Sequence, residues 1–316
     1  MSKIENLFIC MTPLQMVIAR RIIEDKQLKH VGFIIVFYNE NPKYRFYIDN
    51  LKAENYFTIE YRVSSQGKFG RLMDVLKLKL FLRQAKLHTQ NIYLASIDNA
   101  LIHTVLSKIN FQNLYTFDDG LANLNYHGQY YFDTESYVQK LIKLIMGTSW
   151  SLASIKSVSK EHFSLYEHKK NIIPNVTYLK LFRKKLNHQF TLNNQNNLKI
   201  FIGQPLLDIN PYFSTDFIQS SLNNLGIDFY FPHPRETNLP FKIKYINSNQ
   251  ILEDFYIQSY ETSNISLYTF LSTSILHIKE INPDCNVYVL YNDYLLTKYH
   301  DIYKIFLDKN ITMIKI

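Results

Sequence analysis

Two neighbouring carboxylates stand out among the residues that could do chemistry. Asp118 and Asp119 follow the short apolar segment 113–117, and Gly120 after them permits a tight turn. Adjacent carboxylates are costly to bring together unless they are solvated, hydrogen bonded or needed for a reaction. One of them could therefore act as a general base. The alternative is an aspartate-rich turn that caps the next segment.

A second candidate is the segment Pro232-His233-Pro234-Arg235-Glu236. Two prolines stiffen the backbone around His233, and Arg235 supplies a planar, permanent positive charge. An imidazolium beside a guanidinium could stabilise or protonate a departing phosphate. The alternative is a rigid surface turn.

Three further segments could contact a ligand. Ser272 and Thr273 precede a predicted helix, where hydroxyls and backbone amides can bind an anion, although both residue types are also ordinary helix caps. Glu253 could accept hydrogen bonds from ribose hydroxyls, or be an exposed helical carboxylate. The turn Gly203-Gln204-Pro205 could sit beside a ligand or be a plain turn.

Short apolar runs alternate with amphipathic stretches, which predicts the scaffold for these residues. The runs typical of strands are residues 6–11, 31–38, 91–95, 113–117, 199–202, 228–232, 265–269 and 285–290. The stretches typical of helices are residues 14–24, 66–87, 99–108, 215–225 and 253–261. This pattern indicates α/β domains with parallel sheets, in which ligands bind at the carboxyl ends of strands.

A change of composition divides the chain. Residues 138–186 are strongly basic, and 192–197 (LNNQNN) have the composition of a linker. We therefore expect an N-terminal domain over 1–155, a basic connecting segment over 156–197 and a C-terminal domain over 198–316. Two open α/β sheets would then face each other across a cleft.

Composition and missing motifs exclude several classes of protein. The 316 residues are 47% hydrophobic and 20% charged, with only two cysteines, so a disulfide scaffold and a disordered chain are both excluded. The glycines form neither a P-loop nor a dinucleotide-binding fingerprint, and no metal-binding motif occurs. The net charge of +8 favours an anionic partner. No signal peptide or membrane span is evident, which predicts a cytoplasmic or peripheral protein.

The ordered set of motifs resembles glycosyltransferase family 52, the bacterial lipooligosaccharide and capsule sialyltransferases. The matching stretches are CMTPLQMVIARRI (10–22), IYLASID (92–98), TFDDGLANL (116–124), IFIGQP (200–205), FPHPRE (231–236), ILEDF (251–255) and SLYTFLSTS (266–274). They run in family order over nearly the whole chain.

The resemblance implies a GT-B architecture, with two Rossmann-like domains of which the C-terminal one holds a cytidine nucleotide. His233, Ser272 and Thr273 would then meet the phosphate of CMP, and Glu253 the ribose. Arg235 joins them because of its charge and position. Further binding candidates in the matching stretches are Gln15, Gly203, Gln204, Pro205 and Pro234.

The general base is assigned partly by resemblance. Some family members carry an aspartate directly after the Gly-x-Pro turn, where this chain has Leu206, and the nearest acid is Asp208. A related sialyltransferase family uses the aspartate of a DDG motif. Asp119 and Asp118 therefore rank ahead of Asp208.

The resemblance implies an inverting transfer of sialic acid from CMP-sialic acid to a terminal galactose of a capsule or lipooligosaccharide, with α-2,3 linkage. No metal or other cofactor is expected. A homodimer is expected, as is peripheral contact between the basic stretch and an anionic membrane at its inner face, unless that stretch is only a solvated surface. Nucleic acid is not expected as a partner. The alternatives are a UDP-glucose-dependent α-glucosyltransferase of the same family and a non-catalytic protein that binds a nucleotide sugar or nucleic acid.

Overall fold

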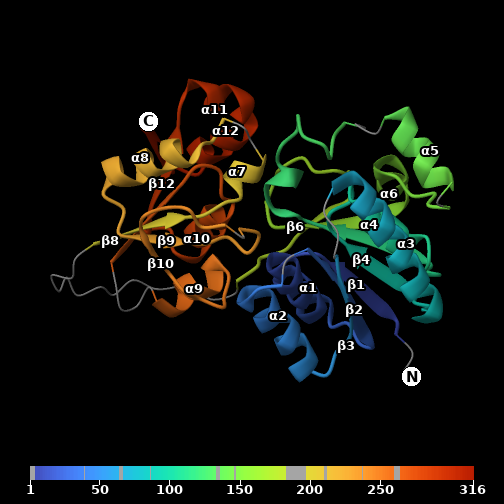
Figure 1. The fold of residues 1–316 in the computed structure, drawn as a ribbon. Coiled ribbons are helices and arrows are strands. Elements are labelled where there is room, and N and C mark those ends of the chain that lie inside the picture. The colour runs from blue at the N-terminus through green and yellow to red at the C-terminus, as the bar shows by residue number, and fades with distance from the viewer. Residues whose placement is uncertain are drawn as a thin grey trace. The chain divides into compact units, whose positions relative to one another are not determined.

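The computed structural model describes residues 4–38, 40–63, 67–85, 87–132, 136–145, 147–182, 197–209, 212–236, 238–259 and 264–316. It divides into two compact units (Figure 1). Unit 1 comprises Met1–Glu40 and Tyr44–Leu181, and unit 2 comprises Asn41–Lys43 and Phe182–Ile316. None of the helices in the described part of the chain combines the length and apolarity that crossing a membrane requires.

Unit 1 is built on a parallel sheet. Over its described residues the strand order is β3-β2-β1-β4-β5-β6-β7. These strands are β1 (Asn6–Cys10), β2 (Val31–Phe37), β3 (Phe57–Arg62), β4 (Asn91–Leu94), β5 (Asn113–Phe117), β6 (Ser159–Ser164) and β7 (Val176–Tyr178). The helical segments are α1 (Pro13–Lys26), α2 (Pro42–Ala53), α3 (Gly67–Ala85), α4 (Ala100–Leu106), η1 (Gly120–Asn123), α5 (Tyr137–Ile145) and α6 (Leu152–Val158).

Unit 2 repeats this plan with its own parallel sheet. The strand order over its described residues is β10-β9-β8-β11-β12-β13. These strands are β8 (Leu198–Ile202), β9 (Phe229–Phe231), β10 (Lys244–Tyr245), β11 (Ile265–Thr269), β12 (Asn286–Tyr291) and β13 (Thr312–Lys315). The helices are α7 (Leu206–Ile209), α8 (Thr215–Leu225), α9 (Leu252–Ser259), α10 (Ser274–Ile281), α11 (Asp293–Lys298) and α12 (His300–Asp308).

The apolar residues of β1 explain how the sheet of unit 1 is covered on both faces. All five residues of β1 are buried, as expected for a strand with both faces covered. On one face, Leu7 and Ile9 join a core that includes Leu78 of α3 and Ile102 of α4. On the other face, the ring of Phe8 stacks on that of Tyr93, with centroids 4.4 Å apart. The sheet of unit 1 is therefore held by apolar packing on both sides.

Helix ends follow the capping rules. The Thr12 side chain accepts from the Gln15 amide at the start of α1, and Pro13 occupies the first turn. Gly226 ends α8 with a φ of 60°, a left-handed conformation that costs glycine little. The start of α1 and the end of α8 are thus each fixed by a local residue.

The basic segment does not form a connection where the sequence predicted one. Strands β6 and β7 extend unit 1 to Leu181, past the expected boundary at residue 155. Buried residues such as His162 and Phe163 pair with β5 there, which a lysine count does not reveal. The predicted linker 192–197 lies outside the described residues except for its last position.

Candidate active site

The strand order of each unit defines where a ligand would bind. Numbered from its own first strand, the sheet has the order 3-2-1-4-5-6-7 in unit 1 and 3-2-1-4-5-6 in unit 2, so the direction in which strands are added changes between β1 and β4 and again between β8 and β11. In open α/β sheets ligands bind at the carboxyl ends of strands at such a switch point. Most of the candidate residues lie at one of these two edges.

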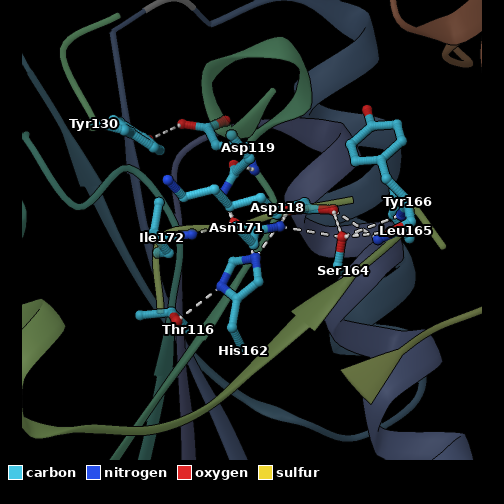
Figure 2. A network of polar contacts seen from close by, with 12 residues as sticks. Thr116, Asp118, Asp119, Tyr130, His162, Ser164, Leu165, Tyr166, Asn171 and Ile172 are labelled. Carbon is cyan, nitrogen blue, oxygen red and sulfur yellow. Dashed lines mark hydrogen bonds and ion pairs between the residues drawn. The ribbon is translucent and has the colours of Figure 1, made fainter. Parts of the chain in front are cut away.

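Asp119 lies at the switch-point edge of unit 1, after β5. Its carboxylate accepts hydrogen bonds from Gln15 Nε2 (2.7 Å), Ser96 Oγ (2.7 Å) and Tyr130 Oη (2.9 Å). Figure 2 shows the Tyr130 contact. Asp119 is only partly buried, so its carboxylate is both oriented by side chains and within reach of solvent. A carboxylate held in this way can accept a proton from a bound hydroxyl.

The donors to Asp119 are themselves fixed. Gln15 is 1% exposed, and its Oε1 accepts from the Met11 amide at 2.6 Å. Ser96 follows β4 with a φ of 50°, a left-handed conformation that non-glycine residues adopt rarely and that often occurs at functional sites. Burial, followed by the charge of Asp119, raises the pKa of Tyr130, so its hydroxyl remains protonated and donates.

A second carboxylate belongs to the same edge. Desolvation, and then the neighbouring charge of Asp119, raise the pKa of Asp98. Burial, and then Asp119, also raise the pKa of the Cys10 thiol, which keeps Cys10 an unreactive core residue. Two carboxyl groups, those of Asp119 and Asp98, therefore lie near each other at this edge.

Asp118 does not lie where a general base is needed, contrary to its place beside Asp119 among the predicted catalytic residues. Its side chain is fully buried, and it accepts from His162 Nε2 (2.8 Å), Ser164 Oγ (2.9 Å), Leu165 N (2.6 Å) and Asn171 Nδ2 (3.1 Å) (Figure 2). These four donors occupy its two oxygens, and complete burial leaves them no access to substrate. Asp118 is thus a structural residue.

In unit 2, Gly203 and Gln204 lie at the end of β8. The Gly203 amide donates to the Phe231 carbonyl at 2.8 Å. A Cβ on Gly203 would lie 2.6 Å from the Tyr230 ring and 2.9 Å from that carbonyl oxygen. Gln204 Oε1 accepts from the Leu271 amide at 2.9 Å, which joins the ends of β8 and β11 across the switch point. These two residues build the edge of the sheet.

His233 lies in a closed turn after β9. Its backbone amide donates to Glu236 Oε2 at 2.7 Å, and its Nδ1 accepts from the Arg235 amide at 3.0 Å. Burial, and then the charge of Arg235, lower the pKa of His233 to about 3. The imidazole is therefore neutral at pH 7, not the predicted imidazolium. With Nδ1 accepting, the proton is on Nε2, which is available as a donor.

Ser272 and Thr273 lie between β11 and α10, and their side chains are 7% and 9% exposed. The Ser272 hydroxyl accepts from the Ser274 amide at 3.3 Å. Glu253 is 1% exposed, and its Oε1 lies 2.8 Å from His277 Nδ1. One oxygen of Glu253 is thus bonded to a buried imidazole, and the predicted ribose contact stays a prediction.

The remaining predicted residues differ in how well they are defined. Pro205 and Pro234 are half-buried beside Gln204 and His233, and the Arg235 side chain is exposed. Asp208 belongs to α7, and its side chain lies outside the described residues. Within the part of the chain that the structure describes, no three His, Cys, Asp or Glu side chains gather as a metal ion would require.

Sequence reasoning missed Ser96, Tyr130 and Glu236 as site residues. Ser96 follows a predicted strand next to the switch point, which is a signal that could have found it. Tyr130 lies eleven residues after Asp119 with no pattern to connect them, and only the fold brings its hydroxyl to the carboxylate. Glu236 accepts from Tyr230 Oη at 2.7 Å and closes the His233 turn.

The sequence of the chain is similar to those of known glycosyltransferases over most of its length. The sequence profile of glycosyltransferase family 52 matches residues 30–293. A CMP-N-acetylneuraminate:beta-galactoside alpha-2,3-sialyltransferase of Pasteurella multocida is 29% identical, over 98% of this chain and 99% of its own length. An N-acetyllactosaminide alpha-2,3-sialyltransferase of Haemophilus influenzae is 30% identical, over 85% of this chain and 86% of its own.

Solved structures resemble the chain in fold alone. Spinosyn forosaminyltransferase aligns with a TM-score of 0.52 at 8% identity, over 99% of this chain and 86% of its own. The glycotransferase of kitacinnamycin aligns with a TM-score of 0.50 at 8% identity, over 100% and 87%. The two Rossmann-like units are those of the GT-B architecture. Because its profile covers most of the chain and its relatives align over nearly the full length, the protein belongs to glycosyltransferase family 52.

Proposed function

We propose that the protein transfers sialic acid from CMP-sialic acid to a galactose hydroxyl, with α-2,3 linkage. The observation that carries this proposal is that the relatives named above as alpha-2,3-sialyltransferases align with 98% and 85% of the chain. An acceptor in a capsule or a lipooligosaccharide fits the galactosides in their names. The two switch-point sites supply groups suited to the acceptor and to the nucleotide.

Asp119 is the proposed general base. The galactose hydroxyl gives its proton to the Asp119 carboxylate while its oxygen attacks the anomeric carbon of sialic acid, and the bond to the CMP phosphate breaks with inversion. Support comes from the three side-chain donors that orient Asp119 and from its partial exposure. A proton acceptor positioned in advance contributes about 10²- to 10⁴-fold to such a step.

The edge of unit 2 is proposed to hold CMP. His233 donates from Nε2 to the phosphate, and the negative charge that develops there is stabilised by a fixed dipole. Ser272 and Thr273, between β11 and the start of α10, contribute hydroxyls and helix-terminal amides to the same phosphate. Arg235 adds positive charge from the same turn. These groups supply the stabilisation for which other transferases use a metal ion, so the reaction is proposed to be metal-independent.

Peripheral membrane contact is proposed for helix α5. Tyr137, Leu141 and Ile145 recur every four residues and are 83%, 47% and 77% exposed. Lys140 is exposed on the same helix. An amphipathic helix of this kind can lie in the surface of an anionic membrane. Liposome sedimentation at low and high salt tests this membrane contact, and equal recovery in the supernatant with and without anionic lipid contradicts it.

We also propose that the protein is a homodimer located at the cytoplasmic face of the membrane.

The decisive experiment is incubation with CMP-sialic acid and a labelled lactoside, with and without EDTA, with the product identified by mass. Formation of sialyl-lactoside at equal rates in both samples is the expected result. UDP-glucose consumption without sialyl transfer would replace the proposal by the glucosyltransferase alternative. Asp119→Ala and His233→Ala should each lose at least about 100-fold in kcat while retaining the thermal transition.

A further inference from the structure

Behind Asp119 lies a network of buried polar side chains that the proposed reaction does not use directly. We define the Asp118 network as Thr116, Asp118, Asn123, His162, Ser164 and Asn171. Its members come from β5, the turn after β5, η1, β6 and the loop after β6, and Figure 2 labels all of them except Asn123. All are at most 6% exposed. Burying so many polar groups is costly unless each is hydrogen bonded, so the network has one well-defined arrangement.

His162 links the Thr116 hydroxyl to the Asp118 carboxylate. His162 Nε2 lies 2.8 Å from Asp118 Oδ1, and its Nδ1 lies 2.9 Å from Thr116 Oγ1. Since a carboxylate only accepts, the Nε2 proton points at Asp118, while Nδ1 shares a hydrogen bond with the Thr116 hydroxyl. His162 therefore fixes the Asp118 carboxylate through its Nε2 proton.

From Asp118 the contacts continue to the backbone of Asp119. Asn171 Nδ2 donates to Asp118 Oδ1 at 3.1 Å, and Asn171 Oδ1 accepts from Asn123 Nδ2 at 3.0 Å. Asn123 Oδ1 accepts from the Asp119 amide at 2.7 Å. The backbone position from which the Asp119 side chain extends is thus connected to His162 through three buried side chains.

Threonine, histidine and aspartate in hydrogen-bonded order also resemble a nucleophilic triad. Thr116, His162 and Asp118 are each 0% exposed, so no substrate carbon can reach the Thr116 oxygen. The Thr116 hydroxyl also lies 3.1 Å from Ser159 Oγ. The arrangement therefore serves position and not covalent chemistry.

We propose that His162 is a positioning residue for Asp119: it holds Asp118, Asn171 and Asn123 in the one arrangement that places the Asp119 backbone, and hence its carboxylate, for proton transfer. This inference rests on the proposed role of Asp119 as general base. Small displacements of a reacting group cost large factors in rate, because proton transfer needs hydrogen-bond geometry.

The test compares two substitutions of His162 with a control substitution that also disturbs the buried core. His162→Phe removes both ring nitrogens, whereas His162→Gln places an amide nitrogen near Nε2 and retains the donor to Asp118. Leu114→Ala is the matched control, since it removes buried apolar volume from β5, the strand that pairs with that of His162, and the Leu114 side chain takes part in none of these hydrogen bonds. Sialyl transfer to the lactoside is measured per molecule of folded protein, at a temperature well below each melting transition.

We expect His162→Phe to lower kcat by about 10- to 100-fold, because a displacement of about 1 Å at a reacting group can cost a factor of this size. The KM for CMP-sialic acid should stay within about twofold. His162→Gln should recover most of kcat, and Leu114→Ala should leave kcat within about twofold. An equal loss of kcat in Leu114→Ala and His162→Phe overturns the inference, as does a His162→Phe variant with the kcat of the wild type.

A double variant separates this inference from the proposed function. If His162 acts through Asp119, then Asp119→Ala with His162→Phe should be no slower than Asp119→Ala alone in long incubations read by mass, because residues that act as a unit are not additive. If the double variant instead loses kcat by the product of the two single-variant factors, the positioning role is overturned. Near-normal kcat in Asp119→Ala alone instead refutes Asp119 as the base.

Discussion

Asp119 receives hydrogen bonds from three side chains, and Tyr130 is the donor that comes from a turn and not from a strand or helix end. Tyr130→Phe keeps the ring, which is 4% exposed, and removes only the hydroxyl. We expect kcat for sialyl transfer to fall about tenfold, because a hydrogen bond to a charged group contributes roughly 1.5–3 kcal/mol. Steady-state kinetics with lactoside as acceptor measure this change in kcat.

Tyr126→Phe is the control for that variant, since the Tyr126 hydroxyl donates to the Lys170 carbonyl in the same region and not to Asp119. It should keep kcat within about twofold. Equal rates for Tyr130→Phe and the wild-type protein would show that the Tyr130 hydroxyl does not orient the base.

His233 provides a prediction about pH. Burial and the charge of Arg235 lower its pKa to about 3, so its ring signals should not titrate between pH 5 and pH 8 in an NMR experiment. Arg235→Gln removes a positive charge that disfavours the imidazolium, so the midpoint should move upward. A His233 resonance that titrates near pH 6.5 in the wild-type protein would refute the neutral, donating imidazole.

At the scale of the element, the turn after β8 should tolerate no side chain at Gly203. The Cβ of Gly203→Ala would fall against the Tyr230 ring, the Phe231 carbonyl and the Glu236 carboxylate. We expect the free energy of unfolding to fall by about 1–3 kcal/mol and CMP binding to weaken, because the displaced groups include those that close the His233 turn. Urea unfolding measures the free energy of unfolding, and calorimetric titration measures the Kd for CMP. An unchanged Kd for CMP contradicts the predicted loss of binding.

Much of the element order could be predicted from sequence, because buried parallel strands leave continuous apolar runs such as 31–37 and 265–269. Strands as short as β7 and β10, with three and two residues, leave no such signal. The different roles of Asp118 and Asp119 could not be predicted either. The residues that bury Asp118 lie 44 to 53 positions later in the chain, and no local pattern contains them.

For the whole molecule, the identity of the nucleotide should be visible in stability. A ligand that binds only the folded state at about 100 times its Kd adds about 2.7 kcal/mol to the free energy of unfolding. We expect CMP to raise the melting temperature, UDP at the same concentration to leave it nearly unchanged, and EDTA to have no effect on the CMP shift. A larger shift with UDP would favour the glucosyltransferase alternative.

Trp150 gives unit 1 an optical signal of its own. It is the single tryptophan of the chain, and its ring lies against Phe111 with centroids 5.6 Å apart, beside the core that includes β1 and α4. Indole emission therefore follows the melting of unit 1 alone, whereas calorimetry records heat from both units. If CMP binds unit 2, a fluorescence melt and a calorimetric melt of one sample would reveal whether nucleotide binding is transmitted to the half of the chain that carries Asp119.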